Sequence, residues 1–172
     1  MTVNQTGQQE RADLLQSLAA QRAFLRQTVK GLTDAQARER TTVSELCLGG
    51  LIKHVSEVES RWADFIVRGP SAIAGFDEAA MAEHQAGFRM LEGETLDGLL
   101  ERYEDVAQRT EELVKSVPSL DSSHPLPEAP WFEPGAKLTV RRALVHMLAE
   151  SAQHAGHADI IRESLDGSKT MG

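Results

Sequence analysis

A carboxylate and three histidines in the segment 140–165 are spaced as metal ligands on a helix would be. Glu150 and His154 lie four residues apart, so on an α-helix their side chains project to the same place, one turn apart. On a helical wheel, His154 falls inside the apolar stripe of this segment and Glu150 falls near its edge. The stripe consists of Val140, Leu144, Met147, Leu148, Ala155, Ala158, Ile161 and Leu165. Because a carboxylate turned toward a core is costly unless it is paired or binds a metal, this pair predicts a metal site.

Two further histidines, His146 and His157, lie on the same flank of this segment. The spacing therefore also permits the pairs His146 with Glu150 and His154 with His157. The position on the wheel favours Glu150 with His154. We expect His146 and His157 to make supporting hydrogen bonds to the ligands, or to lie at the exposed border.

A third ligand has to come from another element, and His54 is the candidate. It lies in the middle of the segment 44–67, on the border of an apolar stripe near Leu51 and Val58. Two histidines and one glutamate would give three protein ligands and at least one open position, which is typical of a catalytic zinc site. The structural alternatives are that His54 is a hydrogen-bonded border residue and that Glu150 is a surface carboxylate.

The other reactive side chains give weaker signals. Cys47 has no histidine one turn away that could activate it, so we interpret it as a small buried hydrophobic residue and not as a nucleophile. His84 and His124 lie in irregular segments, and we expect both to be solvated. Trp131 and Phe132 lie in the proline-rich segment 118–137, where they would fold back as a lid over the bundle end or over a ligand pocket.

The composition excludes several classes of protein. The chain has 172 residues and a formal net charge of −8, which argues against a basic nucleic-acid interface. No apolar run approaches the roughly 20 residues that span a bilayer. A single cysteine excludes an internal disulfide framework and any multi-cysteine metal site. We expect a soluble cytoplasmic protein with one domain over residues 1–172, without nucleic-acid or membrane partners.

The hydrophobic periodicity predicts an all-α protein with four long helices, over about 8–30, 44–67, 96–117 and 140–165. Ser44 and Thr139 are the expected N-caps of the second and fourth, and Thr33 begins a capping box. The segment 71–93 is expected to be a partly helical crossover. Four helices with one long crossover between the second and the third make a four-helix bundle of non-sequential topology. Glycines 49 and 50 near the start of the second helix indicate either a close approach or fraying.

Two stretches resemble the DinB-like superfamily, also called DinB/YfiT-like metalloenzymes. They are SELCLGGLIKHVSEVESRW at 44–62 and LTVRRALVHMLAESAQHAGHADIIRESLDG at 138–167. Many members carry His-x-x-x-His in the last helix, whereas Glu150 stands at the first of those positions here. In this respect the chain is similar to the branch that contains mycothiol-dependent maleylpyruvate isomerase, whose ligands are His, Glu and His. The resemblance implies His54, Glu150 and His154 as ligands, with no catalytic residue beyond them.

The resemblance also implies a chemistry. A divalent metal, zinc or another transition metal such as nickel, would hold the thiolate of a low-molecular-weight thiol (mycothiol or bacillithiol), which attacks a small electrophile. Arg141, Arg142 and Trp131 are the residues whose positions suggest contact with the thiol. A homodimer is expected from the resemblance alone. The alternatives are a metal-dependent hydrolase with the same ligands and a non-catalytic, stress-related helical bundle.

Overall fold

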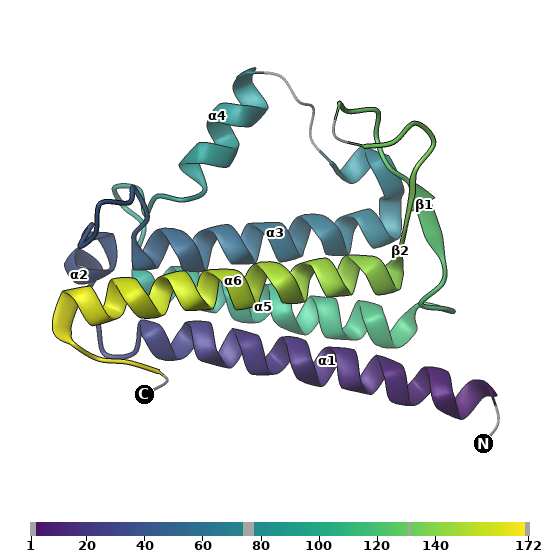
Figure 1. Cartoon of the computed structure of the whole chain (residues 1–172), viewed down its shortest axis with the longest axis horizontal. Coiled ribbons are helices and arrows are strands. Elements are labelled where there is room, and N and C mark those ends of the chain that lie inside the picture. Colours follow the sequence, from purple (N-terminus) through teal and green to yellow (C-terminus); the bar gives the residue numbers. More distant parts are fainter. Residues whose placement is uncertain (1–2, 74–77, 131, 171–172) are drawn as a thin grey trace.

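Four long helices form a bundle in the computed structural model, which describes residues 3–73, 78–130 and 132–170 (Figure 1). They are α1 (Val3–Thr28), α3 (Leu48–Arg68), α5 (Leu96–Ser116) and α6 (Val140–Asp166). The shorter elements are α2 (Asp34–Arg38), the 3-10 turn η1 (Gly69–Ala72), α4 (Glu78–Ala86), β1 (Ser123–Pro125) and β2 (Lys137–Thr139). None of the helices in these ranges is long and apolar enough to cross a membrane.

The order of the helices around the bundle is not their order in the sequence. α6 packs between α1 and α3, and α5 packs on the other side of α3. The consecutive long helices α3 and α5 run in the same direction, so the chain returns along the bundle through η1 and α4, which stands away from the α3 face (Figure 1). The predicted four-helix bundle with a long crossover is confirmed.

Local capping interactions mark the starts of α2 and α6. Thr33 and Gln36 form the predicted capping box of α2. The side chain of Thr139 accepts a hydrogen bond from the backbone of Arg142 at the start of α6, as predicted. The prediction that Ser44 caps α3 is wrong, because this helix begins at Leu48. The hydroxyl of Ser44 instead accepts a hydrogen bond from the amide of Leu46, which makes a local turn before the helix.

The glycine pair near the start of α3 lies where the crossover touches this helix. A Cβ atom on Gly50 would lie 1.9 Å from the carbonyl oxygen of Phe88, and one on Gly49 would lie 2.5 Å from the sulfur of Met90. Only glycine allows the backbone after α4 to come this close. The predicted close approach at these glycines is confirmed, although the partner is the crossover and not another helix. The contact places Phe88 against His54 of α3.

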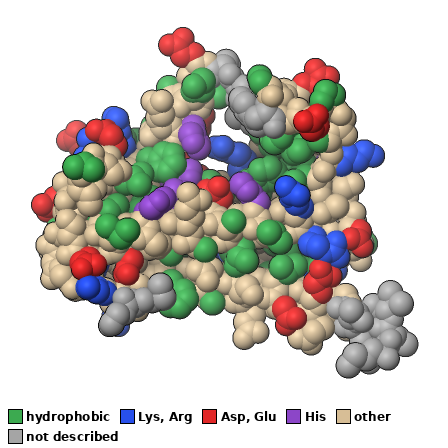
Figure 2. All heavy atoms as spheres, in the orientation of Figure 1, with side chains coloured by type: hydrophobic (Ala, Val, Ile, Leu, Met, Phe, Trp, Pro, Cys, Tyr) green, Lys and Arg blue, Asp and Glu red, His purple; other side chains and the backbone are tan. Residues whose placement is uncertain are grey.

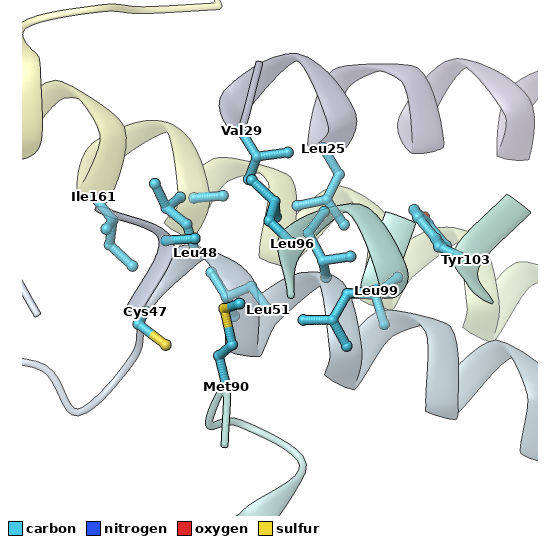
Figure 3. Close-up of a cluster of buried hydrophobic side chains, with 14 of the residues drawn as sticks. Leu25, Val29, Cys47, Leu48, Leu51, Met90, Leu96, Leu99, Tyr103 and Ile161 are labelled. Carbon is cyan, nitrogen blue, oxygen red and sulfur yellow. The ribbon is translucent and has the colours of Figure 1, made fainter. Parts of the chain in front are cut away.

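The core consists of two hydrophobic clusters separated by a buried polar layer. The first cluster includes Leu25, Leu51, Leu99 and Ile161 (Figure 3), and the second surrounds Val114, Leu144 and Met147. The residues of the polar layer come from all four long helices. They are Arg22, Glu59, Thr110 and Ser151, each no more than 5% exposed.

The proline-rich segment after α5 forms a small antiparallel ribbon, which the sequence patterning did not predict. β1 pairs with β2, with Ser123 opposite Thr139. Both strands are edges of a two-stranded sheet, so Pro125 costs no internal ladder hydrogen bond. Of the two proposed lid residues, Trp131 lies outside the described residues, and Phe132 is half-buried.

Candidate metal centre

Three side chains from α3 and α6 converge in the middle of the bundle. His54 projects from α3, and Glu150 and His154 project from α6, which packs directly on α3. One ligand atom from each of the three residues lies within 4.8 Å of the other two. Glu150 Oε2 is 3.5 Å from His154 Nε2 and 3.8 Å from His54 Nε2. The structure thus brings together the three residues that the sequence proposed as ligands.

The spacing of these atoms fits a small divalent cation. Zinc–nitrogen and zinc–oxygen bonds of about 2.0–2.2 Å place tetrahedral ligand atoms roughly 3.3–3.6 Å apart. The distances from Glu150 to the two imidazoles lie within a few tenths of an ångström of that range, and all three ligand atoms lie within 4.8 Å of one another, so small side-chain rotations would bring them onto a shared cation. Two imidazoles and one carboxylate are also a donor set found in catalytic zinc sites that keep an open position. The residues present therefore fit a bound divalent metal.

Burial and mutual contact set the charges of the cluster. Burial lowers the pKa of His54, which is 4% exposed, and so favours the neutral imidazole that a metal requires. The imidazoles of His154 and His54 hold the pKa of Glu150 well below its usual range. At neutral pH the cluster therefore offers an ionised carboxylate beside a neutral His54 ring.

Two further histidines of α6 lie close to Glu150 and His154. His154 faces Glu150 with Nε2, while its Nδ1 lies 3.4 Å from Nδ1 of His157. His146 Nε2 lies 3.8 Å from the other carboxylate oxygen of Glu150. His146 and His157 thus lie beside Glu150 and His154, where they can help to hold these side chains in place.

Aromatic rings hold two of these histidines in place. The ring of Phe88 stacks on His54, with centroids 3.8 Å apart and an interplanar angle of 21°. The ring of Trp62 lies 4.9 Å from that of His146, edge to face. Neither Phe88 nor Trp62 was proposed as a site residue. Trp62 belongs to the apolar stripe of α3, and Phe88 reaches the site only because the crossover packs on Gly50.

A cleft of about 330 Å³ exposes the cluster to solvent. Its walls come from α3, α4, α6 and the segment after α4, and they include Arg61, Trp62, His84, Phe88 and Gln153. Figure 2 shows histidine side chains gathered around a hollow below α4. Such a volume lies within the range of about 300–1,000 Å³ that is usual for small-molecule sites.

Of the two histidines predicted to be solvated, His84 is exposed as predicted and His124 is not. The side chain of His84 is exposed, but its ring lies 5.5 Å from that of His54, so it forms part of the cleft wall. His124 is half-buried, and its Nε2 lies 3.1 Å from the carbonyl oxygen of Ile66 at the end of α3. The prediction that His124 is solvated is wrong, because the loop after α5 folds back onto α3.

The remaining candidate residues lie away from the cleft. Cys47 is a free cysteine, 5% exposed and packed in the first hydrophobic cluster, as predicted. Arg141 pairs with Glu10 and Asp121 near the start of α6. Neither Arg141 nor Arg142 lines the cleft. The structure thus provides no contact between these two arginines and the candidate metal centre.

Comparison with known families and structures agrees with this geometry. The family model for Mycothiol-S-transferase matches residues 13–167. The chain belongs to this DinB-like family. The match spans all three residues of the metal cluster and all four long helices except the first residues of α1. As a mycothiol S-transferase family member, the chain is related to proteins that act on a small thiol. No curated protein matches it significantly.

Two solved structures share the fold. YfiT from Bacillus subtilis, described as a probable metal-dependent hydrolase with an unusual four-helix bundle topology, superposes with a TM-score of 0.67 at 17% identity. The alignment covers 98% of this chain and 91% of that one. A conserved protein from Enterococcus faecalis superposes with a TM-score of 0.62 at 14% identity, covering 98% of this chain and 99% of that one. These likenesses support the DinB/YfiT-like bundle.

Proposed function

We propose that the chain is a divalent-metal-dependent enzyme that uses mycothiol in an S-transfer or isomerisation of a small electrophile. His54, Glu150 and His154 are its metal ligands. The main support for the proposal is that ligand atoms of these three residues lie within 4.8 Å of one another in a cleft that is open to solvent. The match to the Mycothiol-S-transferase family supports the choice of thiol.

The metal would supply the activation that no protein side chain at this site provides. A divalent cation with an open position lowers the pKa of a thiol that coordinates it. The chain's own residues hold the cation in place and shape the cleft. His146 and His157 orient Glu150 and His154. Phe88 covers one face of the His54 ring, and Trp62 packs against the ring of His146.

Zinc is our first choice of metal because two imidazoles and a carboxylate match its usual catalytic ligands. Nickel and copper bind such donor sets as tightly or more tightly, so metal supply also decides occupancy. In an S-transfer, the thiol sulfur forms a bond to the electrophilic carbon. The thiol proton and any leaving group pass to solvent.

Electrophile consumption by zinc-loaded protein tests the proposal. We expect the protein to accelerate the reaction of mycothiol with chlorodinitrobenzene, which releases chloride, above its uncatalysed rate, and the ligand variant His154→Ala to remove this acceleration. Lys115→Ala is the control, because Lys115 is exposed and lies on α5 outside the cleft. A rate that is independent of mycothiol, or unchanged in His154→Ala, would contradict the proposal.

A metal-dependent hydrolase is the second candidate, since the same ligands serve that chemistry and the structurally similar YfiT is described as a probable hydrolase. An activated ester such as p-nitrophenyl acetate separates the two functions. A thiol-dependent enzyme would not accelerate hydrolysis of the ester above its uncatalysed rate. Metal-dependent turnover of the ester without any thiol would favour the hydrolase.

A further inference from the structure

A second and larger cleft lies beside the candidate metal centre. It has a volume of about 550 Å³ and lies mainly between α3 and α5. Its walls include Ser56, Ser60 and Arg61 of α3 and Arg102, Asp105 and Arg109 of α5. None of the proposed metal ligands lines this cleft, so it is a separate feature of the molecule.

Arg61 connects the two clefts, because its side chain lines both. It lies seven residues, or about 10 Å along the helix axis, from His54. A ligand with one end at the metal centre would therefore reach the larger cleft if it extended past Arg61. The metal cleft alone, at about 330 Å³, sits at the small end of the usual range for ligand sites.

The larger cleft presents hydrogen-bonding groups that lack protein partners. Among the described residues, neither Arg61 nor Arg102 makes a hydrogen bond or an ion pair, and Arg109 donates only to Ser60, at 2.6 Å. Ser56 is 1% exposed, and its hydroxyl has no hydrogen-bonding partner within the described part of the chain. The hydroxyl of Ser56 is too deeply buried to reach the cleft, whereas the guanidinium groups of Arg61 and Arg102 are accessible on its wall and can donate hydrogen bonds to a polar ligand.

The charges of the cleft nearly balance. Four carboxylates line it beside the three arginines, from Glu57, Asp64, Glu83 and Asp105. Burial raises the pKa of Glu57 above its ordinary value, which weakens the negative charge at the inner wall. Guanidinium groups donate hydrogen bonds and carboxylates accept them, so this lining suits a ligand with many hydroxyl groups and no net charge.

We infer that the cleft between α3 and α5 binds the sugar–polyol body of the thiol whose sulfur enters the metal cleft; this rests on the proposed function. Mycothiol fits the description, because its acetylated cysteine is joined to an amino sugar and an inositol that carry hydroxyls and no ionised group. Arg102 and Asp105, three residues apart on one face of α5, donate to and accept from these hydroxyls. Arg61 lines both clefts and so lies between the polyol part of the thiol and its sulfur atom.

Calorimetric titration of the zinc-loaded protein tests the inference with three probes. They are mycothiol, its thiol-free analogue N-acetylglucosaminyl-inositol, and N-acetylcysteine, which has the thiol without the polyol. We expect Arg102→Ala and Asp105→Asn each to weaken the binding of mycothiol and of the thiol-free analogue by about tenfold or more. Zinc content and the affinity for N-acetylcysteine stay unchanged. Both residues are exposed, so the variants should fold, and Lys115→Ala on the same helix serves as control.

The outcomes separate the inference from the proposed function. Suppose that the wild type binds mycothiol and that the α5 variants bind mycothiol and the thiol-free analogue as tightly as the wild type does. The assignment of the polyol site would then be wrong, and the proposed metal- and thiol-dependent function would be unaffected. If the zinc-loaded wild type binds neither mycothiol nor N-acetylcysteine, the proposed function fails and the polyol site fails with it.

Discussion

The carboxylate of Glu150 lies between the imidazoles of His54 and His154, with its Oε2 atom 3.8 Å from the first and 3.5 Å from the second. Its other oxygen lies 3.8 Å from His146 Nε2. One carboxylate thus contacts two proposed ligands through one oxygen and a supporting histidine through the other. Substitutions at Glu150 and at His146 therefore report on different roles.

The supporting role of His146 predicts a graded effect on metal binding. His146→Phe keeps an aromatic ring against Trp62 but removes the nitrogen that faces Glu150. We expect the affinity for zinc to fall by about tenfold without being abolished, as is typical of groups that hold ligands in place. Competition with a chelating indicator measures it. His124→Phe, remote from the cleft and packed on Phe65, should leave the affinity unchanged. An equal loss in both variants would argue against the assigned role.

Metal binding should also stabilise the fold. A ligand that binds only the native state at a hundred times its Kd adds about 2.7 kcal/mol to the free energy of unfolding. In a chain of this size that corresponds to roughly 5–10 °C in Tm. We therefore expect EDTA to lower the Tm of the zinc-loaded wild type by such an amount and to leave that of Glu150→Gln unchanged. A wild-type Tm that does not respond to EDTA would support a purely structural bundle.

The contact between the crossover and α3 predicts opposite effects for the same substitution at two glycines. Gly50→Ala would place its Cβ against the Phe88 carbonyl, a backbone atom that cannot rotate away, so we expect a loss of about 1–3 kcal/mol in the free energy of unfolding. Gly156 lies in α6, and a Cβ added there would meet no atom within 4 Å, so Gly156→Ala should add about 0.5–1 kcal/mol. Urea denaturation measures both. Stabilisation by Gly50→Ala would show that the crossover is not held against α3.

The buried polar layer contains an ion pair that should be sensitive to the loss of one partner. The guanidinium of Arg22 donates to both oxygens of Glu59, at 3.0 and 2.5 Å, and the two residues are 5% and 1% exposed. Glu59→Gln would leave the buried guanidinium with only its longer contact to Glu111, at 3.4 Å, at an expected cost of about 3 kcal/mol. Glu104→Gln, which breaks an exposed pair with Arg26, should cost less than about 1 kcal/mol. Similar urea midpoints for the two variants would contradict this difference.

The candidate ligands could be predicted because they lie on long helices with clear periodicity. The apolar stripe of α6 determines which face turns inward, and it places His154 among buried residues and Glu150 at the edge. The stripe of α3 does the same for His54, which is buried. Thr139 could be identified as a helix boundary because caps are local interactions.

The parts that could not be predicted depend on contacts between distant segments. His84 and Phe88 belong to the crossover, whose apolar pattern is too short and too interrupted by glycines to indicate a packing face. They reach His54 because the backbone at Phe88 packs on Gly50, a contact that no local pattern shows. The position of His124 depends in the same way on the loop that folds back onto α3.

Metal content is the most direct test of the shared ligand cluster. We would purify the wild type, Glu150→Gln and Glu163→Gln under zinc-replete conditions and measure bound metal by mass spectrometry. Glu163 is an exposed carboxylate on the same helix that pairs with Lys169, so its variant controls for loss of charge. We predict one divalent ion per chain in the wild type and in Glu163→Gln, and a large loss in Glu150→Gln. Equal metal content in all three proteins would contradict the assignment of Glu150 as a ligand.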